Sequence, residues 1–142
     1  HGPFCDLPLD ITDPELAHAG LTEKQAREKH GKIRIYKYKF SDLDRARTED
    51  TGYGISKFIV DKNNKLVGAH ILGENAGELI HEAQLVKSIG IPFTKIRDVI
   101  HAYPSYSDAV RYPSNLLYVD NLRNNFFVKI LGKIRDYFVK NK

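Results

Sequence analysis

The sequence predicts an α+β domain in which an antiparallel sheet has helices packed on one face. Residues 33–40 alternate strictly between apolar and other side chains, as a half-buried strand does. Residues 53–60 and 65–72 are two more strand-like runs, joined by a turn at 61–64 whose asparagines tolerate positive φ. After Gly73 the apolar residues recur at steps of three and four, which is typical of a helix. Strands that precede helices, with a hairpin in the middle, favour an antiparallel sheet.

The segments around the first strong strand have weaker signals. Residues 7–12 alternate weakly, like a short edge strand, and a turn at Asp13-Pro14 follows. Thr22 and Gln25 form a capping box that opens a short helix over residues 23–30, which Gly31 ends. Residues 42–50 read as a charged connection.

The second half of the chain predicts four helices. The longest has an apolar face made by Ala76, Leu79, Ile80, Ala83, Val86 and Ile89, and ends at Gly90 and Pro92. Thr94 caps a short helix through Ile100, and a proline turn follows at 101–104. Ser105 or Ser107 then caps another helix, which Pro113 interrupts or restarts. The last is amphipathic, with Phe127, Ile130, Leu131, Ile134 and Phe138 on one side.

Composition bounds the class of protein. The chain has 142 residues, 42% of them apolar and 28% charged, which suits one globular domain and excludes a disordered or fibrous protein. No apolar run approaches the ~20 residues needed to span a bilayer, and residues 1–5 lack the pattern of a signal peptide. Because there is no methionine, we expect the chain to be processed or excised from a longer one. The single Cys5 cannot form an internal disulfide.

The net charge of +4 is concentrated at the C-terminus. From Asn121 onward the chain has six basic residues and one acidic residue, a net charge of +5, so the rest of the chain carries a net charge of −1. The interpretation we favour is a last helix docked on the domain. The alternatives are a helix on an acidic membrane surface or against a partner helix. We do not expect nucleic-acid binding, because no binding motif accompanies these residues.

Candidate chemistry is sparse before residue 101. The glycines of residues 68–77 do not form a GxGxxG motif and lack the lysine of a P-loop, so we expect no dinucleotide fold in this chain. An anion at the helix start near Gly77 is an alternative to a purely structural turn. His70 and His81 are not spaced as metal ligands, and we predict no metal site.

Residues 101–108, His-Ala-Tyr-Pro-Ser-Tyr-Ser-Asp, are the most unusual stretch. Such a loop can present an acid or a base at a surface, with Asp108 orienting a nearby ring. The alternative is a helix N-cap by Ser105 or Ser107, with the tyrosines packed beneath it.

Several short segments, in order and spacing, resemble the C-terminal dimerisation domain of the pyridine nucleotide–disulfide oxidoreductases, which are FAD flavoenzymes. The resemblance runs from about Leu7 to about Val119. The matching segments are residues 12–15, 20–23, 44–46, Gly54 with Lys57, residues 68–73, 76–80 and 101–108.

The resemblance implies a homodimer in which each chain lends its 101–108 loop to the active site of the partner. In disulfide-reducing members the residue before the loop proline is the acid–base histidine, held by a glutamate. Tyr103 stands at the histidine position here and Asp108 at the glutamate position, while His101 matches an earlier, noncatalytic histidine. A phenol with a pKa of ~10 cannot cycle protons near neutral pH as an imidazole does. We therefore expect a mercuric reductase-like member, although the tail lacks the paired cysteines of mercuric reductase itself.

The expected site follows from that resemblance. Tyr103, Asp108 and His101 are the candidate catalytic residues, and Ala102, Tyr103 and Pro104 the candidate cofactor contacts. The cofactors would be FAD and NAD(P)H in a cytoplasmic full-length parent, with none bound by this fragment, which alone would be inactive. We divide the chain into a dimerisation domain, residues 1–120, and a basic helix, residues 121–142. The alternative is a free-standing, non-catalytic dimerisation or docking module.

Overall fold

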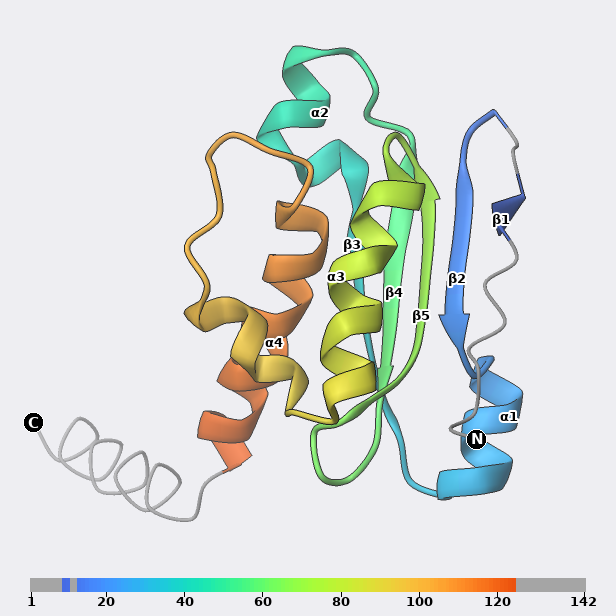
Figure 1. Ribbon diagram of the computed structural model, residues 1–142. Coiled ribbons are helices and arrows are strands. Elements are labelled where there is room, and N and C mark those ends of the chain that lie inside the picture. The colour runs from blue at the N-terminus through green and yellow to red at the C-terminus, as the bar shows by residue number, and fades with distance from the viewer. Residues whose placement is uncertain (1–8, 11–12, 125–142) are drawn as a thin grey trace, which may run out of the picture.

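A computed structural model describes residues 9–10 and 13–124 (Figure 1). They form a five-stranded antiparallel sheet in the order β1-β2-β5-β4-β3. The strands are β1 (Leu9–Asp10), β2 (Leu16–Gly20), β3 (Arg34–Lys39), β4 (Gly54–Val60) and β5 (Leu66–Gly73). The α-helices are α1 (Glu23–His30), α2 (Asp44–Thr48), α3 (Ala76–Ile89) and α4 (Asp108–Asn124), and the 3-10 helices are η1 (Phe40–Asp42) and η2 (Phe93–Asp98). The predicted α+β class is confirmed.

The element that the sequence did not predict is β2. Its sequence, Leu-Ala-His-Ala-Gly, contains no β-branched or aromatic residue, so its strand propensity is low. It pairs with β5 over its whole length, from Leu16 opposite Leu72 to Gly20 opposite Gly68. Pairing with a long central strand therefore decides its conformation. Of the edge strand predicted at residues 7–12, the described part is the two-residue β1.

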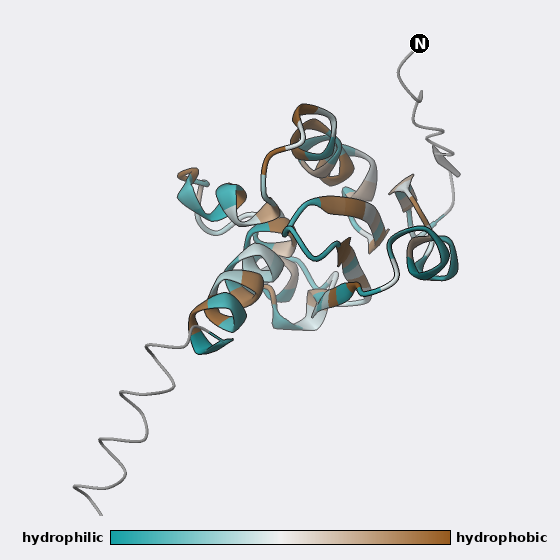
Figure 2. Cartoon of the chain, turned by 90° about the horizontal axis from the view of Figure 1, so that it is seen from below, coloured by the Kyte–Doolittle hydropathy of each residue, from teal (hydrophilic) through white to brown (hydrophobic). Residues whose placement is uncertain are grey.

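Both faces of the sheet are packed, unequally. The main core joins β-strand side chains such as Phe58 and Ile71 to α3, η2 and α4. A second, smaller cluster on the opposite face joins Ala26 of α1 to Ile59 and Val67. The prediction of a sheet covered on one face only was wrong, since α1 packs on the opposite face. The sequence did not indicate this packing, because Ala26 is the only apolar residue of α1. Figure 2 shows this predominantly hydrophilic helix at one edge of the molecule, apart from the apolar interior.

A β-bulge in β5 creates the place where α1 packs. Ile59 pairs with Gly68 and Val60 with Leu66, so Val67 is the extra residue and lies in the second cluster with Ile59. A Cβ on Gly68 would lie 2.1 Å from the carbonyl oxygen of Leu21. Only glycine therefore allows the chain after β2 to cross β5 this closely.

The helix α4 continues through Pro113, so the predicted interruption was wrong. A proline has no N–H, and the carbonyl four residues earlier, on Ala109, loses its usual helical partner. The hydroxyl of Ser56 on β4 donates to that carbonyl at 2.6 Å. The sheet thus supplies the hydrogen bond that the helix lacks.

Two smaller predictions also need correction. Residues 42–50 contain α2 and part of η1 rather than an irregular connection. The helix predicted from Thr94 is η2, which starts at Phe93 without a side-chain cap. The division into residues 1–120 and 121–142 stays a prediction; residue 120 itself lies within α4. The amphipathic helix predicted at 127–138 lies outside the described residues. Within residues 9–10 and 13–124, none of the helices could cross a membrane.

Candidate functional site

The loop between η2 and α4, residues 99–107, carries the predicted site. His101 anchors it to α3: its Nε2 lies 2.8 Å from Oε1 of Glu82, and its Nδ1 lies 2.9 Å from the carbonyl oxygen of Val99. Both ring nitrogens therefore lie within hydrogen-bond distance of an oxygen atom. The side chain of His101 is only 9% exposed. In the isolated chain His101 therefore holds the loop in place.

Tyr103 points away from that anchor and is 68% exposed. Its hydroxyl donates a 2.6 Å hydrogen bond to Oδ2 of Asp44 at the start of α2. That hydrogen bond, and then the negative charge of the Asp44 carboxylate itself, raise the pKa of the Tyr103 phenol. The phenol therefore remains protonated at neutral pH and acts as a hydrogen-bond donor. Ala102 and Pro104 on either side are also exposed.

Asp108 is buried at the first position of α4. Its Oδ1 accepts hydrogen bonds from Nη2 of Arg111 at 2.7 Å and from Nε at 2.8 Å. A carboxylate in the first turn is also favoured by the helix dipole. Asp108 is thus committed to its own helix in this chain, and the contacts that orient Tyr103 come from α2 instead.

Tyr106 fixes the far end of the loop. Its ring is buried, and its hydroxyl lies 2.7 Å from Oε2 of Glu49 and 2.5 Å from Oγ1 of Thr51. Of the two serines predicted to cap the helix, Ser107 accepts the backbone N–H groups of Val110 and Arg111 through its carbonyl. The hydroxyl of Ser105 is buried and has no hydrogen-bond partner among the described residues. The loop is therefore held at both ends while residues 102–104 project into solvent.

The three predicted catalytic residues do not meet as a triad in one chain. His101 contacts α3, Tyr103 contacts α2, and Asp108 contacts its own helix. The sequence could not reveal these partners, because Glu82 and Asp44 lie 19 and 59 positions away from the residues that they bind. For Tyr103 to act on a cofactor, another protein surface that holds the cofactor would have to contact the loop.

The helix start near Gly77 is already occupied by the chain itself. The backbone N–H of Gly77 donates to Oε2 of Glu15 at 2.9 Å, and that of Gly73 to the Glu15 carbonyl at 2.9 Å. The carboxylate of Glu15 thus takes the place of the bound anion that we considered at this helix start. The described part of the chain also contains no group of three or more His, Cys, Asp or Glu side chains that could hold a metal ion.

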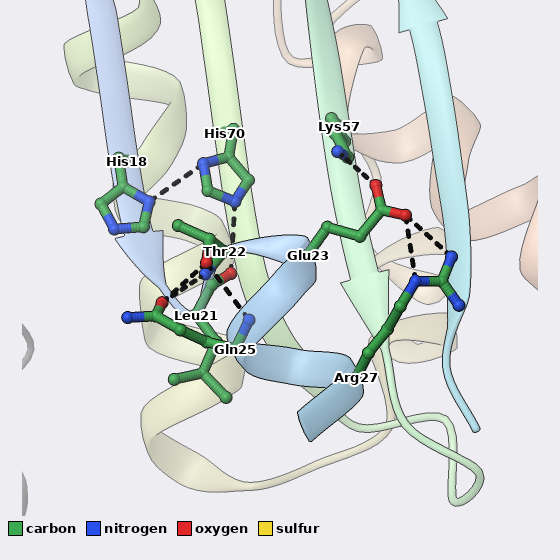
Figure 3. Close-up of polar contacts among 8 residues, drawn as sticks. All are labelled: His18, Leu21, Thr22, Glu23, Gln25, Arg27, Lys57 and His70. Atoms are coloured by element: carbon green, nitrogen blue, oxygen red, sulfur yellow. Dashed lines mark hydrogen bonds and ion pairs between the residues drawn. The ribbon is translucent and has the colours of Figure 1, made fainter. Parts of the chain in front are cut away.

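A second polar cluster, which the sequence analysis missed, lies on the other face of the sheet (Figure 3). His18 on β2 and His70 on β5 are cross-strand partners whose Nδ1 atoms lie 3.0 Å apart. Glu23 of α1 binds Nζ of Lys57 and Nη2 of Arg27, both at 2.8 Å. Hydrogen bonds from Lys57 and then Arg27 lower the pKa of Glu23 to about 2. The histidine pair was missed because it depends on β2, which no sequence pattern indicated.

The comparisons with known proteins agree with the fold. The profile of the "Pyridine nucleotide-disulphide oxidoreductase, dimerisation domain" family matches residues 10–113. The chain is 37% identical over 113 residues to the mitochondrial dihydrolipoyl dehydrogenase of Pisum sativum, covering 78% of this chain and 23% of the relative. It is 38% identical over 113 residues to leghemoglobin reductase of Glycine max, covering 78% and 22%.

A solved structure gives the same result. The HOCl-induced flavoprotein disulfide reductase RclA of Escherichia coli superposes with a TM-score of 0.69 at 32% identity, over 73% of this chain and 24% of that one. The chain thus spans about a quarter of the length of the proteins that it matches. The profile covers most of the described sheet and helices, so this chain belongs to the pyridine nucleotide–disulfide oxidoreductase family, as its dimerisation domain.

Proposed function

We propose that this chain forms the homodimer interface of an FAD- and NAD(P)H-dependent oxidoreductase and lends its Tyr103 loop to the flavin site of the partner subunit. The family match supports the dimerisation role. The flavin is supported by the similarity to a flavoprotein disulfide reductase, and nicotinamide by the family itself. The proposal assigns cofactor binding to the full-length protein and none to this chain alone.

The observation that carries the proposal is the apolar exposure beside the loop. Ile100 is 98% exposed and Val99 is 55% exposed. On α3, Leu85 and Ile89 are 59% and 60% exposed, and their spacing places them on the helix face that also carries Glu82, the anchor of His101. Exposed apolar side chains gathered in this way mark a protein–protein contact. We assign this surface to a second copy of the chain.

The anchoring of the loop fits this role. Ordering a flexible loop on binding costs free energy, and a loop that is already fixed avoids that cost. The part-buried His101–Glu82 pair and the buried Tyr106 fix the loop on both sides of Tyr103. The tip can therefore be presented to the partner in one conformation.

The proposed role of Tyr103 is to donate a hydrogen bond at the partner's flavin site. A protonated phenol suits donation and does not suit proton cycling. The narrower assignment to a mercuric reductase-like member stays a prediction, as does the cytoplasmic location. The curated relatives named above are dihydrolipoyl dehydrogenase and leghemoglobin reductase, and the first of these is mitochondrial.

Steady-state kinetics of the full-length protein carrying Tyr103→Phe test this role. We expect turnover to fall at least about tenfold, as removal of a positioned donor does, with the dimer intact by light scattering. Tyr53→Phe is the matched control, since Tyr53 is also exposed and lies outside the loop. Unchanged turnover in Tyr103→Phe would remove the phenol from the mechanism and leave the dimerisation role standing.

A further inference from the structure

The pair of histidines on the sheet face opposite α3 has the geometry of a chelating site. His18 and His70 are direct cross-strand partners, with 3.0 Å between their Nδ1 atoms. Their ring planes are inclined by only 17°, with centroids 4.6 Å apart. Figure 3 shows the rings side by side, with the two Nδ1 atoms facing each other. Two antiparallel strands thus hold two imidazole nitrogens at a fixed short distance.

The tautomer of His70 is set by the backbone. Nε2 of His70 lies 3.2 Å from the carbonyl oxygen of Leu21, which can only accept a hydrogen bond. Nε2 therefore carries the proton, and Nδ1 faces His18 with a free lone pair. Donation of the remote ring N–H to a backbone carbonyl is the arrangement that orients metal-ligating histidines. Here Gly68 makes it possible, because only a glycine lets the Leu21 carbonyl approach β5.

The Nδ1 of His18 can take the same role. In the described structure it shares one proton with Nδ1 of His70. That proton can move to Nε2 of His18, which has no hydrogen bond within the described part of the chain. Two lone pairs would then face one cation.

The distance between the two nitrogens indicates which cations fit. With metal–nitrogen bonds of about 2.0–2.1 Å, a separation of 3.0 Å gives an N–metal–N angle of about 94°. That angle suits two neighbouring positions of a tetragonal site better than the wider angle of tetrahedral zinc. Among first-row divalent cations, Cu²⁺ binds imidazole most tightly and prefers tetragonal geometry. Because no third side chain of the described residues joins the pair, water would fill the other positions.

The surrounding charges permit a cation. Lys57 lies directly opposite His70 across the strands, and its Nζ is paired with Glu23 at 2.8 Å. We propose that His18 and His70 form a two-imidazole site for a divalent transition-metal cation, with Cu²⁺ as the preferred ion.

Titration of the full-length oxidised protein with Cu²⁺ tests the proposal. We expect one equivalent to give a tetragonal electron paramagnetic resonance spectrum with nitrogen coupling. His18→Asn removes one arm of the chelate, so the apparent affinity, measured by competition with glycine, should fall ~100-fold. His81→Asn, which removes an exposed histidine of α3, should leave the affinity unchanged. Equal affinity and an unchanged spectrum in His18→Asn would overturn the proposal.

A measurement on the unaltered protein does not depend on how a variant folds. With ¹³C-labelled histidine, substoichiometric Cu²⁺ should broaden the ring signals of His18 and His70 before that of His81. Broadening that spares the pair and affects other histidines would contradict the site.

Discussion

Ser56 supplies the hydrogen bond that Pro113 removes from α4. The Ser56 hydroxyl donates at 2.6 Å to the carbonyl of Ala109, the group that a residue with an N–H at position 113 would have bound. Ser56 and Ala109 are both fully buried, so no bulk water can replace the bond. Ser56 and Pro113, which lie 57 positions apart in the sequence, are therefore linked through the carbonyl of Ala109.

Ser56→Ala should destabilise the domain by about 1–3 kcal/mol, because it leaves a buried carbonyl unsatisfied. Urea unfolding measures this change. The Pro113→Ala background provides an internal control, since its restored N–H can bind the Ala109 carbonyl. In that background Ser56→Ala should cost clearly less. Equal costs in the two backgrounds would mean that Pro113 and Ser56 are not coupled.

Gly68→Ala should lower the free energy of unfolding by about 1–3 kcal/mol, because its Cβ would lie 2.1 Å from a backbone oxygen of Leu21 and the chain must shift. Gly52→Ala is the matched control. The nearest atom to a Cβ at Gly52 is 3.5 Å away, an ordinary contact. Its effect should lie within about 1 kcal/mol of zero. A Gly68→Ala protein as stable as the Gly52→Ala protein would show that the close crossing of β5 is not required.

The Glu23 carboxylate should make stability depend on pH in acid. Its pKa is lowered from 4.5 to about 2 in the folded state, so its contribution is fully present above pH 4.5 and is lost as the pH falls from there toward 2. Glu23→Gln should flatten this part of the stability–pH curve measured by chemical denaturation. Glu28→Gln, on the exposed side of the same helix, should leave the curve unchanged. A curve that is as steep in Glu23→Gln as in the original protein would contradict the ion pairs with Lys57 and Arg27.

Regular periodicity made much of this fold predictable. The alternation of residues 33–40 and the three-and-four spacing from Ala76 correspond to β3 and α3. The capping box at Thr22 and Gln25 is also present. Where the local sequence signal was weak or opposed the observed element, long-range contacts determined the secondary structure. The strand β2 forms because it pairs with β5. The helix α4 continues through Pro113 because Ser56 supplies the missing hydrogen bond to Ala109.

The candidate site was likewise predictable only in part from the sequence. The sequence picked out the 101–108 loop from its composition and its resemblance to a family, and the family is confirmed. The partners of its side chains were not predictable, because Asp44 and Glu82 belong to elements distant in the sequence. The His18–His70 pair was hidden for the same reason, since its two members are 52 positions apart. Pairing across strands, rather than spacing along one, brings those rings together.

Sedimentation velocity of the full-length protein, with and without Ile100→Asp, tests the dimerisation role most directly. Ile100 is 98% exposed at the proposed interface, and a buried unpaired carboxylate there would be costly. We predict a dimer for the unaltered protein and a monomer, or a much weaker dimer, for Ile100→Asp. Leu122→Asp, an exposed apolar site on α4, should remain dimeric. An unaltered protein that sediments as a monomer at micromolar concentration would contradict the proposed function, and a dimer undisturbed by Ile100→Asp would contradict the assigned surface.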